Sequence, residues 1–227
     1  MEIRIPVLAV AAVGIVSIVA VPLSASSQMA RAMVEKPKFE RLERRDGYEV
    51  RRYPACIVAQ VTVSGGEEDA MSKGFGALAD YIFGNNVSQS KVAMTSPVIQ
   101  EAGASEKVAM TSPVLQESGG TDSAGQVVQF VMPSKYTMET LPKPNNPAVT
   151  LAQRGERTYA VHKFSWRGKD EQMHKKEAEL RTALARDGVS VTGSAVYARY
   201  DPPWTLPIFR RNEVLLPIEY IEKPQAE

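Results

Sequence analysis

Apolar and polar positions follow two different periods in the first half of the chain. The sequence from 48 to 63 is rich in β-branched residues and predicts a strand, with one apolar face formed by Ile57, Ala59, Val61 and Val63. Next come apolar positions at spacings of four, three and four, which predict one helical stripe: Met71, Phe75, Leu78 and Ile82. The capping-box pattern from Ser64 to Glu67 would start this helix, and Gly84 would follow its end.

A near-identical block then occurs twice. Residues 91–101 read KVAMTSPVIQE, and residues 107–117 read KVAMTSPVLQE. Two strand-like copies so close together predict a hairpin or a local duplication, because a solenoid would need more repeats. A strand is predicted over 126–132, and the proline-rich segment 141–147 reads as a connection.

The second half of the chain repeats the order of the first. A strand is predicted over 149–166, and a helix over 170–186 carries its apolar positions on one face. Strands over 189–200 and 212–220 follow. The order strand, helix, strand, strand thus occurs twice. We predict an α+β fold: a pseudo-symmetric pair of βαββ units that forms a distorted antiparallel sheet or open barrel with two main helices. The cleft where the halves meet would suit a ligand.

The N-terminal segment differs from the rest of the chain, since no charged residue occurs between Arg4 and Arg31. Residues 5–23 are almost wholly apolar, and as a helix they would nearly match the roughly 30 Å hydrocarbon core of a bilayer. We predict that residues 1–33 are a signal peptide or an N-terminal membrane anchor, two alternatives that the sequence leaves open. The protein would then be periplasmic or membrane-anchored. Residues 34–222 would form one domain and residues 223–227 a tail.

Composition narrows the possible functions. The net charge is +1, and no basic stripe with interspersed aromatic residues occurs, so nucleic-acid binding is not expected. Cys56 is the single cysteine, which excludes an internal disulfide and a CxxC motif. Gly74 and Gly76 imitate part of a dinucleotide-binding fingerprint, but they fall inside the predicted helix and not at a turn after a strand. No pair of carboxylates stands out for acid–base catalysis.

Several segments together resemble the SOUL/haem-binding proteins of bacterial type. They are YEVRRY from 48, LADYIFGN from 78, the VAMTSPV block, FVMP from 130, LPKP from 141, YAVHKFS from 159, and YDPPWT with RRNE between 200 and 213. The similarity extends over about residues 35–220 in the same order. The duplicated block and His162 depart from the family pattern. The family's fold, a pseudo-symmetric pair of βαββ units around a distorted sheet, agrees with the order of elements predicted above.

Haem binding is what the resemblance implies, and it suggests where haem would lie. A flat apolar slot is expected along the exposed edge of the first helix and the next strand, and would be lined by Met71, Phe75, Leu78, Ile82 and Met94. Arg210 and Arg211 are candidates for the haem propionates. Each of these residues has an alternative role, in the core for the apolar stripe and in salt bridges for the arginines.

Iron ligation is less clear from the sequence. His162 is predicted on an apolar-leaning strand face, where it could reach a ligand or simply pack at an edge. His174 is predicted on a solvated part of a helix, and the resemblance supplies no dependable axial histidine. We therefore expect loose, non-catalytic binding of haem or a related tetrapyrrole for buffering or transfer.

Three other functions stay open at this stage. The domain could bind another amphipathic small molecule, because a pair of βαββ units also resembles the small-molecule-sensing domains of regulators. It could be a haem-dependent enzyme that uses peroxide. It could also have a structural or partner-binding role with a closed cleft. The ligand, the metal ligand and the oligomeric state are not fixed by the sequence.

Overall fold

The computed structural model describes residues 35–88, 105–118 and 125–221. The N-terminal segment, the first copy of the duplicated block and Met94 lie outside the described residues. Among those described, no helix has the length and apolar character that a bilayer-spanning segment needs.

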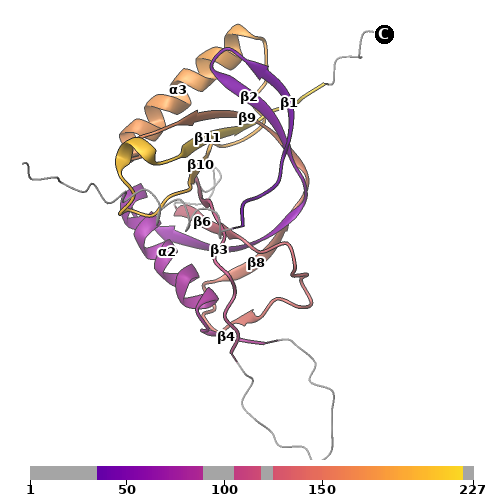
Figure 1. The fold of residues 1–227 in the computed structure, drawn as a ribbon, viewed down its shortest axis with the longest axis vertical. Coiled ribbons are helices and arrows are strands. Elements are labelled where there is room, and N and C mark those ends of the chain that lie inside the picture. The colour runs from indigo at the N-terminus through magenta and orange to yellow at the C-terminus, as the bar shows by residue number, and fades with distance from the viewer. Residues whose placement is uncertain (1–34, 89–104, 119–124, 222–227) are drawn as a thin grey trace, which may run out of the picture.

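Two helices and a large antiparallel sheet form the fold (Figure 1). The helices are α2 (Glu67–Ile82) and α3 (Asp170–Arg186), and η1 (Pro207–Phe209) is a short 3₁₀ helix. The strands of the large sheet are β1 (Glu40–Arg45), β2 (Tyr48–Tyr53), β3 (Cys56–Ser64), β5 (Val114–Ser118), β6 (Gly125–Val131), β8 (Thr150–Arg154), β9 (Arg157–Phe164), β10 (Val196–Arg199) and β11 (Asn212–Pro217). A small separate ladder joins β4 (Asn86–Val87) to β7 (Lys143–Pro144).

The large sheet has the order β1-β2-β9-β11-β10-β5-β6-β3-β8, and every pairing is antiparallel. Within the described residues, β1 and β8 are its two free edges, so the sheet is open and not a closed barrel. One segment, β9-α3-β10-β11, supplies three adjacent strands, and the other, β3-α2-β5-β6, supplies the next three. The two segments meet where β10 pairs with β5. The α+β prediction is therefore confirmed.

Both helices cover the same face of the sheet. Leu78 and Ile82 of α2 pack with Phe130 of β6 in one buried cluster. Met173, Leu180 and Leu184 of α3 pack with strands β2, β9, β10 and β11 in another. Gln116 of β5 pairs with Tyr197 of β10 on one side and with Val128 of β6 on the other. Tyr197 belongs to the α3 cluster and Val128 to the α2 cluster. Because directly paired residues of neighbouring strands point to the same side of a sheet, both clusters lie on one face. We call this the helix face, and its opposite the cavity face.

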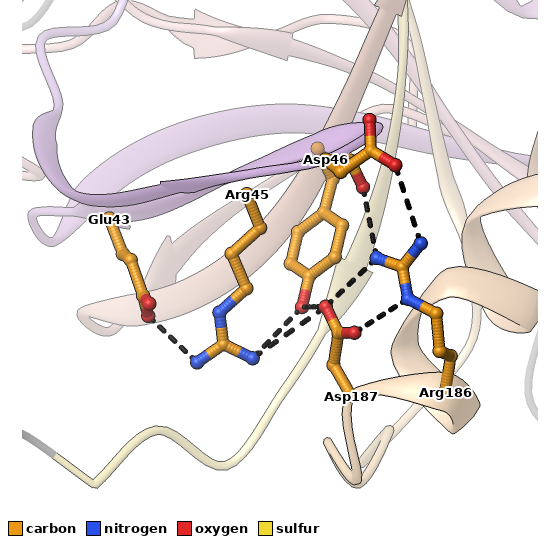
Figure 2. Close-up of polar contacts among 6 residues, drawn as sticks. Glu43, Arg45, Asp46, Arg186 and Asp187 are labelled. Atoms are coloured by element: carbon orange, nitrogen blue, oxygen red, sulfur yellow. Dashed lines mark hydrogen bonds and ion pairs between the residues drawn. The ribbon is translucent and has the colours of Figure 1, made fainter.

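The hairpin formed by β1 and β2 is tied to the end of α3 (Figure 2). Asp187, the C-cap residue of α3, accepts hydrogen bonds from the Tyr48 hydroxyl at 2.9 Å and from Arg186 Nε at 2.7 Å. These bonds hold the pKa of the Asp187 carboxyl down at about 2, with the Arg186 contact the larger cause. Arg45 reaches the same carboxylate at 3.8 Å and also bonds Glu43. The β1–β2 edge of the sheet is thus fixed to the C-terminal end of α3.

Several predicted boundaries are wrong. The strand expected over 48–63 is two strands, because Pro54 has no N–H for a ladder and the chain turns there. The strand expected over 149–166 likewise divides into β8 and β9, which pair with different neighbours. Over 189–200 only 196–199 is a strand, and β1 was not predicted at all.

The predicted helices are confirmed, with one correction at a terminus. Helix α2 begins after Gly66, and no side chain caps it, so the Ser64 capping box does not form. Extended backbone at Gly66, after a positive φ of 123° at Gly65, moves the helix start beyond reach of the serine. Gly84 and Gly188 both follow the helix C-caps with positive φ, as expected of glycines at such ends.

Candidate functional site

A cavity of about 760 Å³ lies on the cavity face of the sheet, opposite the helices. Its floor is apolar because alternate residues of the central strands point to this side. Buried floor residues come from β9, β10 and β11, and Leu115 of β5 is partly buried beside them: Tyr159, Val196, Ala198, Leu215 and Leu115. The floor therefore crosses the junction between the two βαββ segments. Its volume falls within the range of about 300–1,000 Å³ typical of small-molecule sites.

The rim of the cavity is polar and exposed. It is formed by the chain before β1, the turn between β2 and β3, the segment after β6, and the β8–β9 turn. Exposed cations on the rim are Lys36, Lys38 and Arg157, and exposed carboxylates are Glu35 and Glu139. A ligand with an apolar body and charged ends would match this combination of floor and rim.

Arg154 places a further positive charge on the cavity wall. Its guanidinium donates to Gln129 Oε1 at 2.7 Å and to Glu117 at 3.2 Å, and lies 3.4 Å from the Tyr159 hydroxyl. Gln129 donates in turn to Gln60 Oε1 at 3.1 Å. These partners hold the arginine against the floor while it still lines the cavity. A carboxylate of a bound ligand could share the Arg154 donors.

A second polar network lies behind the opposite part of the wall. Glu213 is fully buried and accepts from Arg51 at 3.0 Å and from the Tyr200 hydroxyl at 2.7 Å. Arg211 donates to the same Glu213 carboxylate at 2.7 and 3.0 Å. Tyr53 and Tyr200 of this network line the cavity. A buried carboxylate between two guanidinium groups keeps its charge compensated, as buried ions must be.

Burial controls the ionisation of the polar groups on the wall. Burial, and next the charge of Glu213, raise the pKa of Tyr53 to about 12. The same two causes raise the pKa of the Tyr200 phenol. Burial also raises the pKa of the Cys56 thiol, which lines the cavity. These three groups are therefore neutral near pH 7, and none offers an anionic iron ligand there.

Neither histidine lies at the cavity. On β9 the cavity face carries Tyr159 and Val161, so His162 lies on the helix face. Its Nδ1 is 2.6 Å from the Gly47 carbonyl, and its ring stacks on Phe164. His174 is bonded to the Tyr197 hydroxyl at 2.9 Å, also on the helix face. Among the described residues, no group of three or more metal-ligating side chains occurs. Cys56 and Met138 carry neutral sulfur atoms and line the cavity, whereas Met132 also packs in the buried cluster beneath α2.

The residues predicted for a slot along α2 do not line this cavity. Leu78 and Ile82 are buried between α2 and the sheet, and the partly buried Met71 packs against the same cluster. Phe75 is 38% exposed and makes an edge contact with Phe130 at 5.4 Å between ring centroids. Met94 lies outside the described residues. No bound ligand tests these assignments, and the slot stays a prediction.

The two arginines predicted for the haem propionates, Arg210 and Arg211, have different partners in the structure. Arg210 donates from Nε to the Thr205 carbonyl at 2.7 Å and also bonds the Pro203 carbonyl, so it braces its own loop. Arg211 belongs to the Glu213 network, and its guanidinium lies 4.1 Å from the centre of the Tyr200 ring. Neither lines the cavity.

Sequence reasoning missed Arg154, Arg157 and the tyrosines of the cavity wall. Alternation could have found some of them, because YEVRRY from 48 places Arg51 and Tyr53 on the face opposite Val50. Arg154 reaches the cavity only because β8 lies next to β3. The hydrophobic pattern of a single segment does not specify which strands become neighbours.

The chain matches the model of the SOUL heme-binding protein family over residues 34–217. No curated protein matches it. The C-terminal domain of EcmrR is similar in fold at 12% identity, with a TM-score of 0.52, covering 77% of this chain and 99% of that one. EcmrR in a DNA complex gives 13% identity and a TM-score of 0.52, with 79% and 60% covered. At such identities the likeness concerns the fold alone.

Proposed function

Because the chain belongs to the SOUL heme-binding protein family, we propose that it binds haem or a related tetrapyrrole in the cavity-face pocket, without catalysing a reaction. The observation that carries this proposal is the cavity of about 760 Å³ with an apolar floor and a rim that carries exposed cations. The role would be to buffer the tetrapyrrole or to hand it on.

The residues of the cavity fit the macrocycle better than they fit the iron. Apolar floor residues would contact the ring, and Arg154, Arg157, Lys36 and Lys38 could meet its carboxylates. Haem would supply the iron when bound, and the sulfur donors of Cys56 and Met138 could approach it. The cavity residues themselves would hold the ring, orient its acidic edge toward the rim and exclude water from its faces.

The expected affinity is modest. Burying about 300 Å² of apolar ligand surface at roughly 25 cal/mol/Å² gains about 7 kcal/mol before ordering costs. A micromolar dissociation constant needs about 8 kcal/mol. One or two charge contacts at the rim would close this difference. Such binding suits a carrier that must also release its ligand.

A hemin titration tests the proposal. The full-length chain should shift the Soret band of hemin saturably at micromolar concentrations, and metal-free protoporphyrin should show whether the ring alone suffices. No saturable shift with either ligand at tens of micromolar would remove the tetrapyrrole. Binding of an amphipathic cation instead would favour the alternative ligand class, to which Glu35 and Glu139 on the rim would be suited.

Two finer expectations accompany this proposal. Read toward the shared junction, the strand orders β9-β11-β10 and β3-β6-β5 correspond, which supports a pseudo-twofold relation between the halves. The uncharged stretch over 5–23 supports export, with residues 1–33 as a leader or anchor before the domain. N-terminal sequencing of the protein from its own host would decide between cleavage and anchoring.

A further inference from the structure

The loop between β10 and β11 exposes large apolar side chains to solvent. Trp204 is 81% exposed, Leu206 55%, Ile208 57% and Phe209 56%. Trp166, before α3, is also half exposed. We call 203–209 together with Trp166 the apolar loop surface. Single exposed apolar residues are ordinary, but a cluster of this size marks a surface that meets a partner or a membrane.

Specific hydrogen bonds hold the apolar loop surface in place. Arg210 bonds the carbonyls of Thr205 and Pro203 from inside the loop. The Trp166 amide donates to the Pro207 carbonyl at 2.9 Å, which joins the two parts of the surface. Trp166 has a φ of 101°, a conformation that costs free energy in any residue with a side chain, and its carbonyl accepts from Asn212 Nδ2 at 3.0 Å. The fold therefore keeps these side chains outward at some cost.

The composition of this surface suits a membrane interface. Tryptophan is enriched where bilayer meets water, since its ring is apolar and its N–H needs a polar partner. Leucine, isoleucine and phenylalanine would enter the adjoining acyl region. Exposed Arg167 and Lys169 follow Trp166 and could meet anionic headgroups, although Asp170 and Glu171 reduce the local charge.

The start of the described domain lies close to the same loop. The amide of Ser112 donates to the Glu35 carbonyl at 3.0 Å, and the Ser112 hydroxyl donates to the Tyr200 carbonyl at 3.0 Å. Tyr200 precedes Trp204 by four positions in the sequence. The predicted anchor over 5–23 is thus connected to the domain at a point that Ser112 links to Tyr200, the residue from which this loop starts. Residues 24–34 span at most about 40 Å when extended.

We propose that the apolar loop surface rests in the headgroup region of the bilayer that residues 5–23 enter. The occupant is a phospholipid bilayer, and the segment before Glu35 would keep the surface near it. This proposal does not depend on the ligand of the cavity. It does rest on the expectation that residues 5–23 are retained as a membrane anchor.

The two tryptophans of the chain make a direct test possible, because Trp166 and Trp204 both belong to the apolar loop surface. The full-length chain would be reconstituted in vesicles of phosphatidylcholine and phosphatidylglycerol, with and without lipids brominated in the upper acyl chain. Tryptophan emission should shift to the blue in vesicles and be quenched by the brominated lipids.

A double substitution and a matched control sharpen the test. Leu206→Ser with Ile208→Ser keeps both tryptophans but should lower insertion of the loop by about tenfold or more, with loss of quenching. Phe83→Ser removes a side chain that is 60% exposed at the end of α2 and should leave quenching unchanged. Circular dichroism would show that both variants are folded.

Two results would overturn the proposal. One is emission from the wild-type chain in vesicles that brominated lipids do not quench. The other is equal quenching in the wild type and the double variant. A blue shift without lipid quenching, accompanied by a doubled mass in detergent, would assign the surface to a second copy of the chain instead.

Discussion

The two faces of the large sheet are built from the same strands but differ in what fills them. On the helix face, α2 and α3 close two clusters of buried apolar side chains. On the cavity face, a small apolar floor lies between two networks of charged and hydroxyl groups, and space is left above it. Because strand residues alternate in direction, one sequence supplies a packed core to one side and a binding surface to the other.

The cavity face also differs from the helix face in carrying networks of buried polar side chains. Among the described residues, no buried side-chain nitrogen or oxygen lacks a hydrogen-bond partner. The polar groups of the cavity face are therefore held by each other rather than by a ligand. This arrangement allows the pocket to exist before a ligand enters, in agreement with the loose, reversible binding that we propose.

The largest effect on stability should come from breaking the buried network of the cavity face. Glu213→Ala leaves Arg51, which is 3% exposed, with Glu49 as its remaining carboxylate partner at 2.7 Å, and should lower the free energy of unfolding by about 2–4 kcal/mol. Urea unfolding would measure it. Glu156→Ala removes a carboxylate that is 64% exposed and 3.7 Å from Arg52, and should cost less than about 1 kcal/mol. Equal costs would mean that the cavity-face network does not hold the fold.

Close packing on the helix face gives the next effect. A Cβ on Gly74 would lie 2.5 Å from Cγ2 of Val128, whereas one on Gly76 would meet nothing within 4 Å. Gly74→Ala should therefore cost about 1–3 kcal/mol of unfolding free energy. Gly76→Ala should instead stabilise α2 by about 0.5–1 kcal/mol. Thermal unfolding of both variants measures the contrast, and a stabilised Gly74→Ala variant would show that α2 is not pressed against β6.

These two glycines also show how far the sequence alone leads. Periodicity located α2, α3 and their apolar stripes, because one face of each helix must be buried. It could not separate a core stripe from a ligand slot, since both are apolar with the same spacing; the structure shows Leu78 and Ile82 buried in the cluster beneath α2. The cavity was not predictable for another reason. Its wall joins Arg154 to Tyr159 and Glu117, whose meeting depends on strand order across the sheet.

The smallest effect should appear at low pH, at the tie between the hairpin and α3. The pKa of Asp187 is about 2 in the folded protein against an ordinary value of 3.8, so its folded-state value is depressed. Its contribution to stability is therefore complete above about pH 4 and is lost as the pH falls toward 2. Urea unfolding between pH 2 and 5 should show a flatter dependence for Asp187→Asn than for the wild type.

A matched variant controls for the loss of a carboxylate as such. Asp69 on α2 pairs with Lys73 at 3.7 Å, and its side chain is 75% exposed. Asp69→Asn should leave the acid dependence of unfolding close to that of the wild type. If both variants flatten it equally, the Tyr48–Asp187 tie has no special part in acid stability.

The most direct test of the central claim asks whether the tetrapyrrole binds on the cavity face or along α2 on the helix face. Leu115→Trp fills the cavity floor from a partly buried position, and Phe75→Ala removes an exposed ring from the predicted slot on α2. Hemin titration should give wild-type binding for Phe75→Ala and no saturable Soret shift for a folded Leu115→Trp variant. Unchanged binding by Leu115→Trp, with loss of binding by Phe75→Ala, would contradict the account and return the ligand to the helix face.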